Sequence, residues 1–275
     1  MIEEICKKAK AASFQLAKTS TEQRNSALCK MADSLERNCG QILEANQKDV
    51  EAAQARGVKE ALIDRLILDK RRVTSMASTL REVAEMHDPL NEIVKTWTRP
   101  NGLIIGQLRV PLGVIGIIYE SRPDVTSEAS GLCIKSGNAI ILRGGSDAIN
   151  SNMTIGNALR TALEEADLTK DIIQVVPLTD RKYAEQLMQM REYIDVLIPR
   201  GGANLIKTVV EKSTVPVIET GTGNCHIYVE DDADLTRAID IVINAKTQRP
   251  GTCNAAEKLL VHKNVAKQFL PKVVS

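Results

Sequence analysis

The sequence predicts an α/β fold, namely an open and mostly parallel sheet that follows an N-terminal helical segment. Apolar residues recur at helical spacing through the first 86 residues. From residue 103 onward, short β-rich runs appear, and most of them alternate with stretches of helical character. Because such alternation requires β–α–β crossovers, we expect a parallel sheet covered by helices on both faces.

The N-terminal segment, residues 1–90, should consist of helices. Its first helix is indicated by apolar residues spaced three or four apart: Ile2, Ile5, Ala9, Ala12 and Leu16. The capping box Ser20-Thr21-Glu22-Gln23 predicts the start of a second helix. Further helices are expected over residues 41–56, with Gly57 as the cap, and over residues 70–86.

Seven β-rich runs follow this segment. They are Leu103–Arg109, Gly113–Tyr119, Ala139–Arg143, Ile172–Val176, Ile194–Pro199, Val215–Glu219 and His226–Val229. The stretches with helical character cover residues 125–136, 147–166, 180–190, 203–212 and 232–246. The first run should instead form a hairpin at about 95–110, since Pro100-Asn101-Gly102 is a turn signal after Lys95-Thr96-Trp97. Such an exposed ribbon favours pairing with a second chain, so we expect a homo-oligomer.

Composition excludes several classes of protein. The 275 residues carry 36 Lys+Arg and 35 Asp+Glu, a net charge of +1, without the basic block of a nucleic-acid-binding protein. Aromatic residues make up only 3%, too few for stacking on single strands. There is neither an apolar run long enough to span a membrane nor a secretory signal at the N-terminus, so we expect a cytoplasmic protein without a membrane partner.

The six cysteines are scattered and include no C-x-x-C pair, and the three histidines are equally dispersed. We therefore expect neither a disulfide framework nor a metal site. Cys253 differs from the others because it follows the Pro250-Gly251 turn, where a thiol can be exposed and the nearby Arg249 favours the thiolate. The alternative is that Cys253 is inert, as a single cysteine of an intracellular chain usually is. The other five cysteines lie in apolar patterns, where a cysteine behaves as a small hydrophobe.

Two R-G-G segments echo each other, at Arg143-Gly144-Gly145 and Arg200-Gly201-Gly202. Each closes a predicted strand and opens a predicted helix, where backbone N–H groups can receive an anion and the arginine can bind phosphate. Both loops are candidate nucleotide-binding loops. Each can equally be a simple turn, and the dinucleotide fingerprint G-x-G-x-x-G is absent.

These segments, taken in order, carry a resemblance to a known family. The relevant stretches are Pro111-Leu112-Gly113-Val114-Ile115-Gly116, Tyr119-Glu120-Ser121-Arg122-Pro123, residues 136–145, Ile198-Pro199-Arg200-Gly201-Gly202, Glu219-Thr220-Gly221 and residues 247–254. Together they resemble the γ-glutamyl phosphate reductases (glutamate-5-semialdehyde dehydrogenases), a branch of the aldehyde dehydrogenase superfamily. The resemblance covers essentially the whole chain.

The resemblance implies a Rossmann-type domain that binds NADPH and an oxidoreductase of proline biosynthesis that reduces L-glutamate 5-phosphate to the semialdehyde and releases phosphate. It further implies a cofactor domain over residues 1–230 and the beginning of a catalytic domain over 231–275. Cys253 matches the family's nucleophile, and Arg143 stands where many relatives contact the adenine ribose. Gly201 and Gly202 match the loop against the pyrophosphate.

Further residues are assigned by the same resemblance. Ser121 replaces the oxyanion-binding Asn of hydrolytic aldehyde dehydrogenases, and Glu219 aligns with their general base but should be dispensable in a reductase. The candidates for binding substrate phosphate or carboxylate are Arg122, Asn138, Arg249 and Asn254, each of which can instead be structural. His226, inside a strand-like run, is expected to be a core residue.

Family members run well beyond residue 275, so we expect a truncated chain that binds cofactor but turns over poorly. Functional coupling to glutamate 5-kinase is a further expectation. Two alternatives stay open, a hydrolytic aldehyde dehydrogenase that uses Glu219 as base and an inactive cofactor-binding fragment. The first predicts NADP⁺ reduction without phosphate and loss of turnover in Glu219→Gln. A non-catalytic scaffold or subunit, favoured by the missing part of the chain, predicts that Cys253→Ser changes nothing measurable beyond the thiol count.

Overall fold

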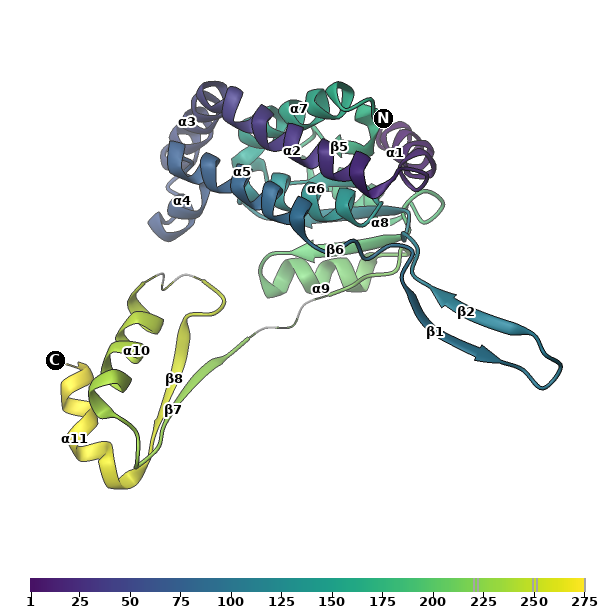
Figure 1. Ribbon diagram of the computed structural model, residues 1–275. Coiled ribbons are helices and arrows are strands. Elements are labelled where there is room, and N and C mark those ends of the chain that lie inside the picture. Colours follow the sequence, from purple (N-terminus) through teal and green to yellow (C-terminus); the bar gives the residue numbers. More distant parts are fainter. Residues whose placement is uncertain (220, 222, 249, 251, 275) are drawn as a thin grey trace. The chain divides into compact units, whose positions relative to one another are not determined.

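The computed structural model describes residues 1–219, 221, 223–248, 250 and 252–274, without the side chain of Ala61. The chain divides into two compact units, residues 1–220 and residues 221–275 (Figure 1). Within the described part, no helix is both long enough and apolar enough to cross a membrane.

The first unit begins with helices, as the spacing of apolar residues predicts. They are α1 (Ile2–Leu16), α2 (Thr21–Arg37), α3 (Cys39–Ala55), α4 (Glu60–Leu66) and α5 (Lys70–Glu85). The capping box is confirmed, because the Ser20 side chain accepts from the Gln23 backbone while the Gln23 side chain accepts from the Ser20 backbone. Helix α4 was not predicted, because its two turns are too short for a clear apolar stripe.

Four parallel strands form the sheet of this unit in the order β5-β4-β3-β6. Their bounds are β3 Val114–Tyr119, β4 Ala139–Arg143, β5 Ile173–Val175 and β6 Val196–Arg200. The connecting helices are α6 (Asp124–Lys135), α7 (Ile149–Glu165) and α8 (Arg181–Met188), and α9 (Ala203–Lys212) follows β6. The predicted open parallel sheet is therefore confirmed.

The predicted strand at residues 215–219 is wrong. This stretch contributes a single bridge, between Val217 and Leu197 of β6. Pro216 has no N–H to donate, although its carbonyl accepts from the Leu197 N–H at 2.8 Å. The stretch thus touches the sheet edge without becoming a strand.

Strand β3 is buried along its whole length, and its side chains alternate between two cores. Ile115, Ile117 and Tyr119 join the core that holds α2, α5, α6 and α7. Val114 and Ile118 join the core of α8, α9 and the N-terminal part of α1. The helices on both faces leave the ends of the strands as the place where polar groups can gather.

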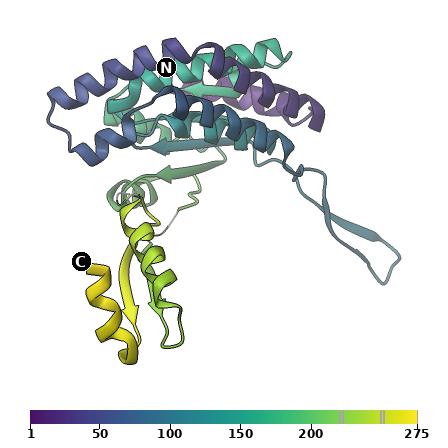
Figure 2. The same ribbon diagram turned by 60° about the vertical axis from the view of Figure 1, so that its left-hand side comes forward.

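The hairpin lies outside the main sheet, as predicted. Strands β1 (Ile93–Thr98) and β2 (Ile104–Leu108) pair in antiparallel fashion, and β1 is exposed at every position. Figures 1 and 2 show this ribbon extending away from the rest of the first unit.

The second unit is one β–α–β–α succession: β7 (Cys225–Val229), α10 (Leu235–Thr247), β8 (Ala256–Val261) and α11 (Lys263–Val274). The two strands are parallel neighbours, and Val229, Val242 and Phe269 form the centre of their core. Strand β7, which a boundary at residue 230 would assign to the first domain, therefore pairs within the second unit. His226 is exposed, so its predicted place in a core is wrong. Within the second unit, position 226 lies on the face of the β7–β8 sheet opposite the core of Val229, Val242 and Phe269.

Candidate active site

The carboxyl edge of the four-stranded sheet collects most of the residues that the sequence analysis selected. Ser121 and Arg122 follow β3, Gly144 and Gly145 follow β4, and Gly201 and Gly202 follow β6. The strand order places the topological switch between β3 and β6, since the chain winds outward from β3 to β5 and then returns to β6. Ligands of open α/β sheets bind at this point.

The loop after β6 leads into a helix whose first turn is open. Gly202 is the N-cap of α9 and provides no side chain to accept from the helix. Gly202, Ala203 and Asn204 are exposed, and the first backbone N–H groups with acceptors in the helix are those of Leu205 and Ile206. An anion placed here would meet free N–H groups and the positive end of the helix.

Position 201 needs a glycine because neighbouring side chains approach its backbone closely. A Cβ at this position would lie 2.6 Å from Cδ of Glu120 and 2.8 Å from Cδ2 of Leu205. The N–H of Glu120 also donates to the carbonyl of Arg200 at 3.1 Å, which joins the loops after β3 and β6. The exposed Glu120 side chain thus lies against the glycine loop at the switch point.

The loop after β4 differs from its sequence echo. Gly145 leads into a 3₁₀ turn, Ser146–Ala148, and then into α7. The N-terminus of α7 is closed by the buried carboxylate of Asp49 from α3, which accepts from the N–H groups of Asn150 at 3.2 Å and Ser151 at 2.8 Å. The expectation of an open helix N-terminus is therefore met by α9 and not by α7.

Arg143 provides the positive charge at this second loop. One of its terminal nitrogens donates to the carbonyl of Thr179 at 2.8 Å, while its buried Nε has no hydrogen-bond partner among the described residues. Burial lowers the pKa of Arg143, and the nearby charge of Arg181 at the start of α8 lowers it further. Two guanidinium groups close to each other form a site that an anion would stabilise.

Two side chains in the loop after β3 differ in availability. The Ser121 hydroxyl donates to Oδ2 of Asp147 at 3.0 Å, and Asp147 in turn pairs with Arg56 at 2.7 Å. The Arg122 side chain has no hydrogen bond or ion pair with any described residue, and the same holds for Arg200. Two uncommitted guanidinium groups therefore flank the switch point.

Asn138 lies at the other edge of the sheet. It precedes β4, is 3% exposed, and accepts from the Gly113 N–H at 2.9 Å. Its amide also donates to the carbonyl and the hydroxyl of Ser136. The structure thus does not bring Asn138 together with the other candidate residues, and its hydrogen bonds account for it as a residue that shapes a turn.

The candidate nucleophile belongs to the second unit. Cys253 is exposed in a turn before β8, which the hydrogen bond from the Ala255 N–H to the Thr252 carbonyl closes at 3.2 Å. The N–H of Cys253 and the side chain of the exposed Asn254 have no acceptor or partner among the described residues. Arg249 lies outside the described residues. Glu219 is exposed and belongs to the first unit.

The relationships of the chain to known proteins agree with this arrangement. Residues 1–275 match the aldehyde dehydrogenase family along their whole length. The chain belongs to the aldehyde dehydrogenase family.

Within this family, the chain is similar to proteins named γ-glutamyl phosphate reductase. It is 56% identical over 273 residues to the one from Thermoanaerobacter pseudethanolicus, covering 99% of this chain and 66% of the relative. The crystal structure of the Thermotoga maritima reductase superposes with a TM-score of 0.89 at 50% identity, covering 99% of this chain and 66% of that one. The Saccharomyces cerevisiae reductase gives 0.74 at 32% identity, covering 99% and 69%. The chain thus spans slightly less than two thirds of the first two proteins.

The structure also shows groups that the sequence analysis missed. Arg181 joins Arg143 because α8 starts close to the end of β4; the Asp180-Arg181-Lys182 run after a predicted strand was the available signal. Glu230, Asp231 and His262 offer ligand atoms within 4.8 Å of one another, close enough for a metal ion. An Asp231–His262 contact of 3.4 Å and a hydrogen bond from Asn264 to Asp231 account for Asp231 and the half-buried His262 without an ion.

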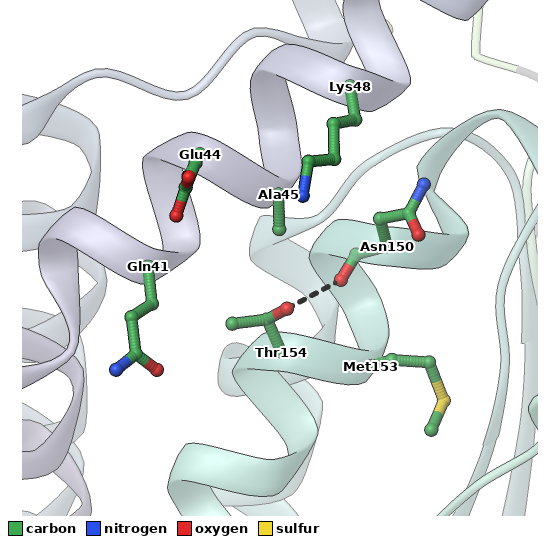
Figure 3. Close-up of a pocket in the computed structure, with 7 residues that line it drawn as sticks. All are labelled: Gln41, Glu44, Ala45, Lys48, Asn150, Met153 and Thr154. Carbon is green, nitrogen blue, oxygen red and sulfur yellow. Dashed lines mark hydrogen bonds between the residues drawn. The ribbon is translucent and has the colours of Figure 1, made fainter.

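A hollow of about 370 Å³ lies between α3 and α7 (Figure 3). Gln41, Glu44, Ala45 and Lys48 of α3 line it from one side, and Asn150, Met153 and Thr154 of α7 from the other. No candidate residue named above lines this hollow, so we assign it no part in the site.

Proposed function

We propose that this chain belongs to an NADPH-dependent reductase of L-glutamate 5-phosphate, which forms the 5-semialdehyde and releases phosphate in proline biosynthesis. The observation that carries the proposal is the identity of 50–56% with reductases of that name along almost the entire chain. We assign residues 1–220 to cofactor binding and residues 221–275 to the beginning of the catalytic part.

The residues of the first unit fit NADPH. The open first turn of α9, with Gly201 and Gly202 before it, suits a pyrophosphate, and a Cβ at Gly201 would enter the space of Glu120 and Leu205. Arg143, with its unpartnered Nε, and Arg181 suit the 2′-phosphate that distinguishes NADPH from NADH. When bound, NADPH supplies the hydride.

Cys253 provides the covalent chemistry. An acyl phosphate is already activated, so attack by the Cys253 thiolate expels phosphate and leaves a thioester, whose carbonyl accepts hydride more readily than a carboxylate would. The N–H of Cys253, which has no acceptor among the described residues, is the donor that we assign to the developing oxyanion. Ser121 is not assigned this role, because its hydroxyl donates to Asp147.

The remaining polar groups are assigned to substrate binding. Arg122 and Asn254, whose side chains have no partner among the described residues, match a phosphate and a carboxylate. Arg249 is proposed for the same role from its place in the sequence. Asn138 is left out, since its side chain is satisfied at the opposite edge of the sheet.

The hairpin is proposed to pair with a second copy of the chain. Its exposed apolar residues include Ile93 and Ile104, which are 64% and 69% exposed. We further propose that a glutamate 5-kinase delivers the acyl phosphate, because such an anhydride hydrolyses readily in water. Six free thiols agree with a cytoplasmic location.

The test measures NADPH formation from glutamate semialdehyde and NADP⁺, with and without inorganic phosphate. Turnover that requires phosphate, is lost in Cys253→Ser and is kept in Cys29→Ser would support the proposal; Cys29 is an exposed cysteine on α2. Turnover without phosphate that is lost in Glu219→Gln would instead establish a hydrolytic enzyme.

A second measurement covers a chain that does not turn over. Calorimetric titration with NADPH tests the cofactor site, and mass spectrometry after incubation with acetyl phosphate tests acylation of Cys253. If NADPH does not bind at millimolar concentration and Cys253 is not acylated, the proposal is wrong.

A further inference from the structure

Two cysteines lie together at the start of the β7–β8 sheet. Cys225 is the first residue of β7, and Cys253 lies in the turn that precedes β8. The Cys225 thiol donates to the carbonyl oxygen of Cys253, with 3.5 Å between sulfur and oxygen. Residues 28 positions apart in the sequence are thereby in direct contact.

The local fold explains why they meet. Cys225 is the strand partner of Ala256, and neighbouring strands lie roughly 4.7–4.9 Å apart. The turn closed between Thr252 and Ala255 then folds the chain back, which brings the Cys253 backbone over the Cys225 sulfur. Gly223 leaves room beside this turn, since even a Cβ there would lie 3.7 Å from the Cys253 carbonyl.

A disulfide needs Cα atoms roughly 4.4–6.8 Å apart and sulfurs that can rotate toward each other. A contact between one cysteine's sulfur and the other's carbonyl already fixes the two backbones close together. What remains is rotation of the Cys253 side chain about χ1, and an exposed side chain in a turn has the freedom to rotate.

The other four cysteines have no comparable neighbour. Cys6 and Cys133 are buried, and burial raises the pKa of each thiol to about 12, which keeps them protonated and inert. Cys29 and Cys39 lie on helices of the first unit, Cys29 exposed and Cys39 half-buried. Among the cysteines of the described part of the chain, Cys225 and Cys253 are thus the pair joined by a hydrogen bond, from the sulfur of one to the backbone carbonyl of the other.

We infer that Cys225 is a resolving thiol for Cys253, so that oxidation by a hydroperoxide ends in a Cys225–Cys253 disulfide. In the first step the Cys253 thiolate attacks one oxygen of hydrogen peroxide, the O–O bond breaks, and Cys253 sulfenic acid and hydroxide form. In the second step the Cys225 thiolate attacks the sulfenic sulfur, the S–O bond breaks, and hydroxide leaves. The sum is two thiols and one peroxide converted into one disulfide and two waters.

The consequence is protection of the thiol from irreversible oxidation. Without a resolving partner, a sulfenic acid continues to sulfinic acid, which thiol reductants do not reverse. With Cys225 in contact, Cys253 is held as a disulfide that a thiol reductant opens again. That the disulfide also stops catalysis, reversibly, rests on the proposed function of Cys253.

The experiment treats the 275-residue chain with hydrogen peroxide, blocks free thiols and maps peptides under non-reducing conditions. The variant is Cys225→Ser, and the matched control is Cys29→Ser. We expect wild type and control to yield a peptide pair cross-linked between Cys225 and Cys253, which dithiothreitol separates into two alkylatable thiols. In Cys225→Ser, Cys253 should be recovered as sulfinic acid that dithiothreitol does not restore.

Three results would overturn the inference. They are recovery of wild-type Cys253 as sulfinic acid beside a free Cys225, cross-linking of Cys253 to Cys29 or Cys39, and equal overoxidation of Cys253 in wild type and Cys225→Ser. None of these readouts requires turnover. A disulfide that forms in a chain whose Cys253 is not acylated by acetyl phosphate would support the thiol pair while the proposed function fails.

Discussion

Gly144→Ala tests whether the loop after β4 is as tightly packed as the structure shows. A Cβ at residue 144 would lie 2.1 Å from Nδ2 of Asn152 and 3.0 Å from Cζ of Tyr119. Ordinary contact begins at 3.4 Å, so the overlap with Asn152 is 3.4 − 2.1 = 1.3 Å. Both neighbours are 1% exposed, and the Asn152 amide oxygen accepts from Thr126 at 3.1 Å, so the side chain cannot move aside without breaking that bond.

Overpacking of this kind costs about 1–3 kcal/mol. At about 2 kcal/mol, a protein of this size should lose roughly 4–8 °C in Tm. Gly40→Ala is the matched control, since Gly40 is exposed on α3 with nothing within 4 Å of its Cβ position. Alanine there should stabilise the helix by up to about 1 kcal/mol. Scanning calorimetry measures the Tm of both variants and of wild type. A Gly144→Ala protein with the Tm of wild type or higher would refute the packing argument.

Three further predictions concern charge. Arg143→Met and Arg181→Met should each weaken NADPH binding about tenfold while leaving NADH binding within twofold, because a charge-assisted phosphate contact contributes about 1.5–3 kcal/mol. Calorimetric titration measures the affinity for both cofactors. Equal losses of affinity for NADPH and NADH would contradict a 2′-phosphate site. Asp49→Ala should lower the free energy of unfolding, measured by urea denaturation, by about 1–3 kcal/mol, since the α7 N–H groups lose their buried acceptor. The control Asp33→Ala, at an exposed ion pair, should lower it by less than about 1 kcal/mol. Asp88→Asn should destabilise the protein by roughly 3 kcal/mol at neutral pH, because the buried Arg24 loses its ion-pair partner. The difference in stability from wild type should shrink as pH falls below about 4. Thermal unfolding across pH measures this difference, and a difference that does not depend on pH would contradict the ion pair.

The sign of the pH effect follows from the surroundings of Asp88. Burial acts to raise the pKa of this carboxyl, but hydrogen bonds from Thr21 and the Leu90 N–H and the charge of Arg24 outweigh burial and leave the pKa below its usual value. A carboxyl whose pKa is lowered by folding stabilises the protein above its unfolded pKa, and that stability is lost as pH falls through the folded pKa. Lys135 on the adjoining α6 adds positive charge near the pair.

The sequence predicted the elements that depend on residues within a few positions of one another. The capping box at Ser20 and the β-rich run Gly113–Tyr119 are patterns within a few neighbouring positions, and both are found in the structure, the run as β3. Residues 215–219 carry β-branched side chains but contribute one bridge, because Pro216 interrupts the row of donors. Strand β8 escaped notice because Glu257 and Lys258 break its apolar pattern; it exists through pairing with β7. Asn138 was selected from a motif, and the motif gave no sign that its side chain bonds to Gly113 and Ser136 before β4.

The two R-G-G segments show most clearly what a sequence leaves open. Both follow strands, yet the helix after Gly145 has its first N–H groups satisfied by Asp49, about a hundred positions earlier, while the helix after Gly202 remains open. No spacing rule connects Asp49 to α7, since packing of α3 against α7 creates that contact. The loops therefore offer an anion different groups: guanidinium from Arg143 at one and backbone N–H at the other. A ligand whose ribose carries a phosphate monoester at one end and a pyrophosphate at the other would satisfy both loops. Two identical loops would not distinguish the monoester from the pyrophosphate.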